Sequence, residues 1–318
     1  MATRNARTLA GVFIFACVAL LHGCASWTPE TKALAQHRPA GIPGAHELTE
    51  VPFFAQSQYQ CGPASLAMVM VAAGVQVTPE ELVPEVYLPE RKGSLQVEML
   101  AAPRRHGLVS YQLPQTYAAV VREVAAGTPV IILQNLGFKE GWHYAVVVGY
   151  DWDNGMVQLR SGLNERQELP FAMNELIWRR SGYWAMVAVP PDRIPASAEE
   201  NRWLAALAAF ERTAQPSASR AAYRTFLERW PENVNAAIGL ANTHYALGEL
   251  REAELVLRDA AKRAPESVVV LNNLAQVLAD QGRYSEALPY VERAAATGGP
   301  HADAVSQTRS AILQKLGR

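Results

Sequence analysis

Cys61 is the residue whose type and position best suit covalent chemistry. It is followed by Gly62, Pro63 and the apolar run ASLAMVMVAAG, which ends at Gly74. Proline is favoured in the first turn of a helix and glycine just after the last, so we expect a helix that begins at or just after Cys61. The partial positive charge at a helix N-terminus stabilises a thiolate and lowers the pKa of a cysteine there. We therefore interpret Cys61 as a nucleophile rather than as a buried structural thiol.

A thiol nucleophile needs a proton acceptor, and we favour His143 among the seven histidines. The others lie near the N-terminus or in the C-terminal helical part, except His106. That residue precedes Gly107 at the end of a helical stretch, where a cation can simply interact with the helix C-terminus. His143 opens the Val-rich segment HYAVVVGYD, which has the composition of a strand. A histidine at the start of a strand can face a helix N-terminus across a cleft, so we expect His143 rather than His106 to be the general base.

The spacing of these residues resembles that of a known enzyme family. Gln-x4-Cys-Gly-Pro-Ala over residues 56–64, a helix, and then a histidine 82 residues after the cysteine resemble papain-like cysteine peptidases. Within them the pattern is most similar to the bacteriocin-processing peptidase domain, which removes double-glycine leaders. The resemblance covers about residues 47–190 and implies a papain-like α+β fold there.

The resemblance also implies roles for individual residues. Cys61 corresponds to the nucleophile and His143 to the group that accepts and returns its proton. Gln56 corresponds to the side-chain donor of the oxyanion hole, which stabilises the charge that develops on the carbonyl oxygen. Gln58 and Gln60 are nearby alternatives for this role.

The group that orients His143 must come from the returning strand. Asp151 and Asp153 are suitable by type, but eight residues of strand at about 3.3 Å each place Asp151 roughly 26 Å from His143. Both aspartates adjoin Asn154-Gly155, which is a strong signal of a hairpin turn. We therefore expect them at the turn end of the hairpin, far from the histidine.

Folding back about this turn places residues 161–164 opposite His143. The resemblance implies an Asp-Pro pair at this place, where this chain has Ser161-Gly162. We therefore assign the orienting role to Ser161, with Asn164 as the alternative. The departure from an acidic residue leaves a Cys–His dyad with a weaker orienting group, which predicts slower catalysis or a different acyl-transfer reaction.

The surrounding segments predict an α+β domain over residues 47–190. Runs rich in Val and Ile, bounded by Gly, Asp and Pro, are typical of strands, and most of them follow the helical stretch after Cys61 and another near residues 94–106. These runs are VPFFAQ, PVIILQN, HYAVVVGYD, MVQLR and YWAMVAVP. Prolines then interrupt the chain, so we expect a linker over residues 191–198 and a helical domain over residues 199–318.

The helical part contains an internal repeat. When Val234 and Val268 are aligned, 34 residues apart, small and apolar residues recur in register. This period and pattern resemble the tetratricopeptide repeat (TPR), with a degenerate first unit over 203–231 and a closing helix over 302–316. The resemblance implies an all-α domain that binds a protein partner on its concave face. The first repeat has Ala237, Leu240, Ala241, Gly248, Ala253, Leu257, Ala260 and Pro265, and the second has Leu271, Leu274, Ala275, Gly282, Ala287, Val291, Ala294 and Gly299.

The N-terminus has the features of an export signal. A basic start is followed by the uncharged apolar run from Leu9 to Leu21, which is too short to span a membrane. The run ends in Leu21-His22-Gly23-Cys24, which resembles the lipobox of bacterial lipoproteins. The resemblance implies removal of residues 1–23 as a signal peptide and lipidation of Cys24, so that acylation attaches the chain to a lipid membrane.

The segment after Cys24 completes this prediction. Residues 24–46 are rich in Pro, Gly and small residues, and we expect a tether. Ala25 in place of aspartate implies an outer-membrane anchor, with the protein facing the periplasm. Cys61 would then be the only free thiol in a compartment that favours disulfides, which calls for a role other than pairing.

Composition and motif content narrow the function further. The 29 basic and 30 acidic residues give no basic excess, so we expect no nucleic-acid partner. No ligand spacing typical of a metal site occurs, so we expect neither a metal nor another cofactor. Two functions remain: a membrane-anchored cysteine peptidase that acts on peptide or protein substrates, or a catalytically degenerate peptide-binding scaffold.

Overall fold

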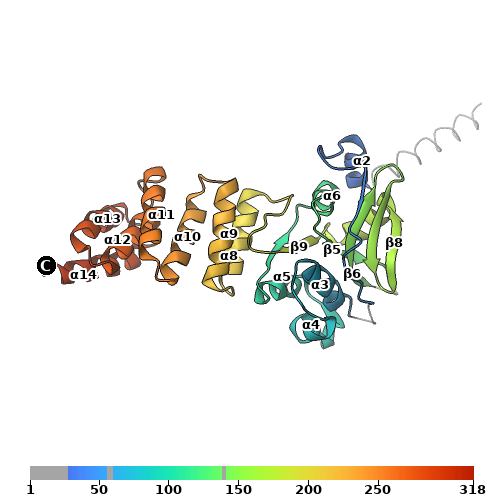
Figure 1. Ribbon diagram of the computed structural model, residues 1–318, viewed down its shortest axis with the longest axis horizontal. Helices are drawn as coiled ribbons and strands as arrows, with labels where there is room; N and C mark the ends of the chain where they lie inside the picture. The colour runs from blue at the N-terminus through green and yellow to red at the C-terminus, as the bar shows by residue number, and fades with distance from the viewer. Residues whose placement is uncertain (1–27, 56–59, 138–140) are drawn as a thin grey trace, which may run out of the picture. The chain divides into compact units, whose positions relative to one another are not determined.

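The computed structural model describes residues 28–55, 60–137 and 141–318 (Figure 1). These residues form two compact units. The first consists mainly of residues up to Val189 and the second mainly of Ala198–Arg318. The first unit mixes strands and helices and the second is helical, so the predicted fold class is confirmed. The expected signal peptide and Cys24 lie outside the described residues.

A sheet of seven strands is the centre of the first unit. Its neighbouring strands for which a register is given run antiparallel, and β6 is the long central strand. Across the sheet the strands are β4 (Val109–Gln112), β9 (Ala185–Val189), β5 (Val130–Asn135), β6 (Trp142–Asp151), β7 (Met156–Ser161) and β8 (Asn164–Pro170), and β1 (Ala45–Glu47) pairs with β6 beyond the end of β5.

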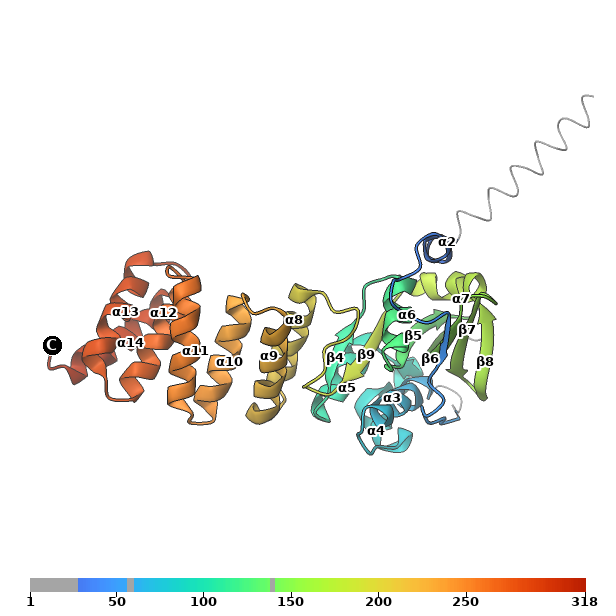
Figure 2. The same ribbon diagram turned by 45° about the horizontal axis from the view of Figure 1, so that its top comes forward.

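Helices cover both sides of the central strands. Helix α3 (Cys61–Ala72) and helix α6 (Tyr117–Ala125) lie on opposite sides of β5 and β6 (Figures 1 and 2). This explains why both strands are continuous apolar runs rather than alternating ones. The remaining elements of this unit are α2 (Pro29–Gln36), α4 (Pro79–Val86), β2 (Tyr87–Leu88), the 3-10 turn η1 (Pro89–Arg91), β3 (Gly93–Ser94), α5 (Gln96–Arg105), α7 (Phe171–Trp178) and the 3-10 turn η2 (Arg179–Ser181).

Helix α3 begins and ends where the sequence predicts. Cys61 is its first residue, and Gly74, just after the helix, has a φ of 93°, which a residue with a side chain rarely adopts. Every residue from Gly62 to Met70 is buried. A helix that is apolar on all sides belongs in the interior, so α3 fixes its first residue firmly against the sheet.

The segment expected to be a tether is instead largely folded. Helix α2 has its first turn bound by the buried carboxylate of Glu175, which accepts from the N–H groups of Glu30 at 2.9 Å and Thr31 at 2.7 Å. The N–H groups in the first turn of a helix need such acceptors, and Glu175 comes from a distant part of the sequence. The prediction of a tether is therefore wrong for α2 and for β1, whose strand pairing also depends on distant residues.

The second unit consists of successive antiparallel helices in the predicted 34-residue register. Most of the aligned apolar side chains of both repeats are buried, which confirms their role in packing, whereas Val234 and Val268 are half-buried and Pro265 is exposed. Gly248 and Gly282 have φ values of 75° and 78° and lie between the two helices of each repeat. The helices are α8 (Glu200–Glu211), α9 (Pro216–Arg229), α10 (Val234–Ala246), α11 (Leu250–Arg263), α12 (Val268–Asp280), α13 (Tyr284–Thr297) and α14 (Ala302–Lys315).

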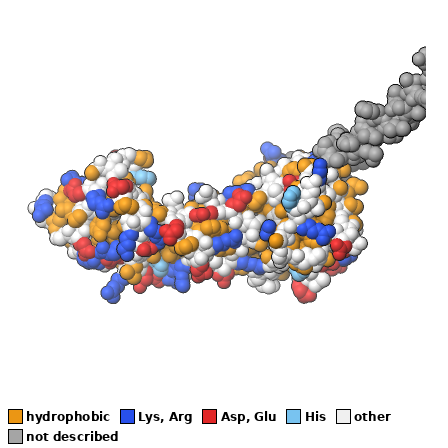
Figure 3. All heavy atoms as spheres, turned by 90° about the horizontal axis from the view of Figure 1, so that it is seen from above, with side chains coloured by type: hydrophobic (Ala, Val, Ile, Leu, Met, Phe, Trp, Pro, Cys, Tyr) orange, Lys and Arg blue, Asp and Glu red, His pale blue; other side chains and the backbone are white. Residues whose placement is uncertain are grey.

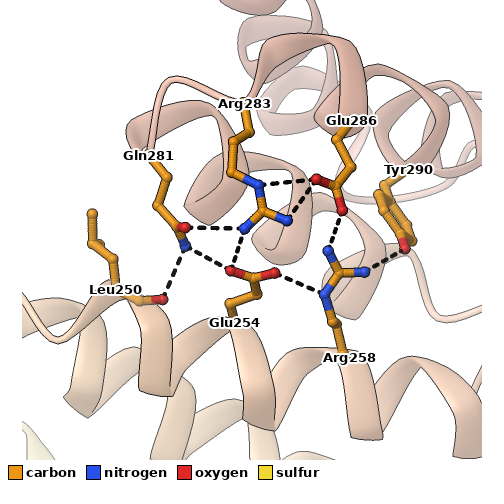
Figure 4. Close-up of polar contacts among 7 residues, drawn as sticks. All are labelled: Leu250, Glu254, Arg258, Gln281, Arg283, Glu286 and Tyr290. Carbon is orange, nitrogen blue, oxygen red and sulfur yellow. Dashed lines mark hydrogen bonds and ion pairs between the residues drawn. The ribbon is translucent and has the colours of Figure 1, made fainter.

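A polar network joins the second helices of neighbouring repeats (Figure 4). The Glu254 carboxylate on α11 accepts from Arg258 Nε at 2.8 Å, from Arg283 at 2.6 Å and from Gln281 Nε2 at 3.0 Å. Arg283 also donates to Glu286 on α13. The two arginines lower the pKa of the Glu254 carboxyl against the opposing effect of burial. The network therefore links one repeat to the next through charges of both signs.

Basic and acidic side chains are interspersed on the face of the described residues that Figure 3 shows. This face has no large basic patch of the kind that binds nucleic acid. Among the described residues, no helix combines the length and the apolar character needed to cross a bilayer.

Candidate active site

Cys61 lies at the N-terminus of α3 and is partly exposed. Burial raises the pKa of its thiol, and hydrogen bonds from the backbone N–H groups of Tyr144, Gly62 and Cys61 itself offset this only in part. The expectation that the helix lowers this pKa is therefore wrong. The rest of the first helical turn is buried, so the loss of solvation outweighs the helix field. The free protein holds a neutral thiol at neutral pH.

His143 lies at the start of β6, opposite Gln134 of β5. Its Nε2 is 3.0 Å from Ser161 Oγ at the end of β7. Burial lowers the pKa of the imidazole to about 4, so the ring is neutral at neutral pH. With Nε2 engaged by the hydroxyl, Nδ1 is the nitrogen left to accept a proton.

Two contacts fix α3 against β6 at this point. The Tyr144 N–H contacts the Cys61 sulfur, and the Tyr144 carbonyl accepts from the buried Ser65 Oγ at 3.3 Å. Tyr144 follows His143 directly, and Ser65 lies one helical turn after Cys61. The backbone of β6 is therefore held on the helix turn that carries the thiol.

One cleft brings the predicted residues together. Cys61, His143 and Ser161 all line it, and its volume is about 1080 Å³, which is large enough for several residues of an extended peptide. Asn164, the alternative orienting residue, lines the same cleft and pairs with Ser161 across the β7–β8 turn. The hydrogen bond that the structure gives His143 is the one to Ser161.

The candidates for the oxyanion donor are only partly described. Gln56 and Gln58 lie outside the described residues. Gln60 is the N-cap residue of α3, and its carbonyl accepts from Ala64 N at 3.2 Å. The N–H of Cys61 is one of the first-turn groups with no carbonyl partner within the helix, so beside its contact with the Cys61 sulfur it can serve as a backbone donor.

The competing candidates have structural roles. His106 Nε2 is 2.7 Å from Glu85 Oε1, and His106 does not line the cleft. The Asp151 carboxylate accepts from the N–H groups of Asp153 and Asn154, each at 3.0 Å, in the β6–β7 turn. The predicted hairpin is confirmed, and its aspartates are turn residues at the end away from His143.

Sequence reasoning missed the β2–β3 hairpin as part of the site. Its Ser94 lies so close to Gly62 that a Cβ added to the glycine would be 2.2 Å from Ser94 Oγ. Tyr144 Oη also donates to the Ser94 carbonyl at 3.1 Å. The turn signal in Arg91-Lys92-Gly93 predicts a hairpin, but only tertiary structure shows that it packs against the residues beside Cys61 and His143.

The comparison with protein families agrees with this fold. The model of the peptidase C39-like family matches residues 48–186. This chain has a peptidase C39-like domain. Tetratricopeptide repeat models match residues 197–269 and 238–304, so TPR repeats follow the C39-like domain. The predicted resemblance to this peptidase family and to the repeats is confirmed.

Solved structures with similarity to the chain fall in the same two groups. A C39-like peptidase from Bacillus anthracis is 19% identical with a TM-score of 0.39, covering 46% of this chain and 97% of that one. A double glycine motif protease from an AMS/PCAT transporter, in complex with the leader peptide, is 20% identical with a TM-score of 0.35, covering 45% and 93%. The TPR2B domain of yeast Sti1, in complex with pHsp70, is 17% identical with a TM-score of 0.35, covering 36% and 97%. No curated protein is significantly similar to the chain.

The described residues contain no group of three or more His, Cys, Asp or Glu side chains arranged to hold a metal ion. The arrangement that is present consists of a neutral thiol, a neutral imidazole and a hydroxyl 3.0 Å from the imidazole Nε2. Such a set can carry out acyl transfer in which the imidazole removes the thiol proton during attack.

Proposed function

We propose that this C39-like domain is a cysteine peptidase, with Cys61 as nucleophile and His143 as general base and acid. The observation that supports this most directly is that both residues line one cleft, while Ser161 Oγ lies 3.0 Å from His143 Nε2 and leaves Nδ1 for the thiol proton. For Nδ1 to accept the thiol proton, Nε2 must carry a hydrogen and donate it to Ser161 Oγ. A hydroxyl can accept this hydrogen, so Ser161 is compatible with the tautomer that catalysis needs.

The reaction begins with a neutral pair. The Cys61 sulfur bonds to the carbonyl carbon of the substrate while its proton passes to His143 Nδ1. The tetrahedral intermediate collapses to a thioester as the C–N bond breaks, and His143 returns the proton to the leaving amine. Water then attacks the thioester with His143 again as base, which releases the carboxyl product and restores the thiol.

The oxyanion needs donors in the same cleft. We propose the Cys61 N–H and the Gln56 side chain for this role. Removing one such donor costs roughly 100- to 1,000-fold in rate in other acyl-transfer enzymes. Gln56→Ala is therefore expected to lose about that factor in kcat.

Turnover of peptides by the full chain tests the proposal. Hydrolysis of a fluorescence-quenched peptide library should disappear in Cys61→Ala and fall by at least about 100-fold in His143→Ala, since general-base catalysis contributes that much. His106→Gln is a matched control, because His106 contacts Glu85 outside the cleft. Equal turnover in wild type and His143→Ala, with both proteins folded, would rule out this mechanism.

The group that contacts His143 and the protonation of Cys61 favour a second function. A hydroxyl rather than a carboxylate or amide orients His143, and the thiol is not acidified. A catalytically degenerate domain that only binds peptides has no need for either. This alternative predicts that peptides bind in the cleft of the wild-type protein with no cleavage and no His143-dependent labelling of Cys61 by a peptide carrying an electrophile.

We also propose how the protein is placed and what it binds. Acylation of Cys24 would anchor it in the outer membrane, facing the periplasm, as the lipobox-like sequence predicts. TPR repeats in general mediate protein–protein contacts, and we propose that residues 199–318 recruit a protein partner or a substrate to the peptidase.

A further inference from the structure

We propose that the cleft selects acidic peptides, through cations that come from two separate elements; this rests on the proposed peptidase function only for the step of cleavage. Arg91 and Lys92 line the cleft from the β2–β3 hairpin, and Arg180 lines it from η2. Among the described residues that line the cleft, none is Asp or Glu. The cleft is therefore positively charged in a chain whose total charge is close to zero.

The hairpin cations are held at a fixed position relative to the nucleophile. Ser94 at the base of the hairpin packs against Gly62, with no room for a Cβ between them, and its carbonyl accepts from Tyr144 Oη. Gly62 follows Cys61 and Tyr144 follows His143. The hairpin therefore rests on the neighbours of both reacting residues.

The conformation at the tip of the hairpin supports a role for its side chains. Lys92 has a φ of 48°, in the left-handed region where glycine is the ordinary choice. The neighbouring glycine, Gly93, begins β3, so the strained position is occupied by a lysine and not by this glycine. A lysine there costs stability and adds a positive charge at the cleft.

The third cation, Arg180 of η2, is also held in place. Arg180 donates to the carbonyl of Asn135 at 3.2 Å. Asn135 pairs with Trp142, the residue before His143, so this guanidinium is also placed relative to the dyad. Its contact is with a neutral carbonyl, which leaves the positive charge of the guanidinium available to a ligand.

The apolar part of the lining fits a peptide rather than a small anion. Leu133, Leu136 and Trp142 line the cleft, and the Trp142 side chain is 56% exposed. A ligand that satisfies both the charges and this apolar surface is an extended peptide with Asp or Glu on both sides of apolar residues. Electrostatic complementarity of this kind gives specificity and salt dependence.

Binding to the full chain carrying Cys61→Ala tests the inference without turnover. Three fluorescent decapeptides share an Ala, Gly and Leu scaffold and carry Glu, Gln or Lys at the same four positions. The Glu peptide should bind about tenfold more tightly than the Gln peptide at low salt, and the Lys peptide most weakly. The preference should shrink as the salt concentration rises.

Matched variants separate the cleft from the overall charge. In the same background, Arg91→Gln/Arg180→Gln should remove most of the preference for Glu. The control Arg122→Gln/Arg224→Gln makes the same charge change at exposed residues outside the cleft and should retain it. Equal affinity for the Glu and Gln peptides, or equal loss of preference in both double variants, would overturn the inference.

Hydrolysis of the same peptides by the wild-type chain distinguishes the two proposals. Selective binding of the Glu peptide without cleavage of any peptide would support the preference for acidic peptides and reject the peptidase. Cleavage of Glu and Gln peptides with equal kcat/KM, together with equal binding, would leave the peptidase standing and reject the acidic preference.

Discussion

At the residue scale, the central feature is a thiol and an imidazole that are both neutral. Burial raises the pKa of Cys61 and lowers that of His143 to about 4, so each group resists the charge that an ion pair would require. In the proposed mechanism the proton would therefore move from the thiol to the imidazole only as the sulfur attacks the substrate. This differs from a cysteine that is stored as a thiolate.

The state of the free thiol can be measured by alkylation. Because the Cys61 pKa is raised, its thiolate fraction increases only at alkaline pH, and the rate of reaction with iodoacetamide should keep rising above pH 9. Peptide mass mapping would assign the label to Cys61 rather than to another cysteine. A rate that is already at a plateau below pH 7 would show a preformed thiolate and contradict the neutral pair.

Ser161 should affect both the rate and its dependence on pH. Ser161→Ala removes one hydrogen bond to Nε2 and should lower kcat by about tenfold, the equivalent of about 1.4 kcal/mol.

A pKa of about 4 means that neutral His143 is lost only as the pH falls through 4, so wild-type kcat/KM should decline there. Ser161→Asp places a negative charge beside the ring, which raises the His143 pKa and should move this decline to higher pH. An unchanged profile in Ser161→Asp would show that the side chain does not act on His143.

The sequence alone predicted the residues that meet in this cleft but not their protonation. Cys61, His143 and Ser161 follow from a helix start, a strand start and the geometry of a hairpin, which are local signals. The pKa of Cys61 depends on how deeply α3 is buried, and the contact of Ser94 with Gly62 depends on a hairpin thirty residues further along. Neither can be read from local patterns.

At the element scale, Gly239 shows how tightly the repeats pack. A Cβ at this position of α10 would be 2.4 Å from Tyr223 Cζ, and the Tyr223 hydroxyl is held by Glu211 at 2.7 Å. Alanine gains about 1 kcal/mol in helix propensity, whereas overpacking costs about 1–3 kcal/mol. Because the ring is anchored at its far end, we expect overpacking to dominate.

Gly239→Ala should therefore destabilise α9 and α10. Hydrogen exchange of the full chain should become faster in peptides from these two helices. In a Tyr223→Val background the ring is absent, and the same glycine substitution should be neutral or stabilising. Slower exchange in the single variant would mean that helix propensity decides the outcome instead.

Elements with a strong period or a strong turn signal were predictable, and others were not. Helix α3, strands β5, β6, β7 and β9 and the 34-residue register follow from apolar runs and glycine positions. Strand β8 was missed because NERQELP is polar and mostly exposed at the edge of the sheet. Residues 51–55 of VPFFAQ form no strand, although their composition favours one.

Helix α2 was missed for a different reason. It is short, and its first turn depends on the Glu175 carboxylate from α7. The following strand β1 likewise depends on its pairing with β6. A segment rich in Pro and Gly has the composition of a tether whether or not a distant carboxylate binds it. Composition therefore could not distinguish the two.

At the scale of the whole molecule, the proposed anchor at Cys24 has a direct test. In a bacterial host, the wild-type chain should incorporate labelled palmitate and sediment with the membranes. Cys24→Ala should lose both the label and the membrane association, whereas Cys61→Ala should retain them. Palmitate incorporation that persists in Cys24→Ala would place the lipid elsewhere or reject this route of attachment.

The Glu175 grip on α2 would give an anchored enzyme a short reach. Between an acylated residue 24 and Pro29, where the docked helix begins, the backbone can extend only about 17 Å. The C39-like domain would then be confined to a thin layer beside the bilayer and could not reach the rest of the periplasm. Polypeptides emerging from the membrane, or held there by other proteins, would meet it far more often than freely diffusing ones.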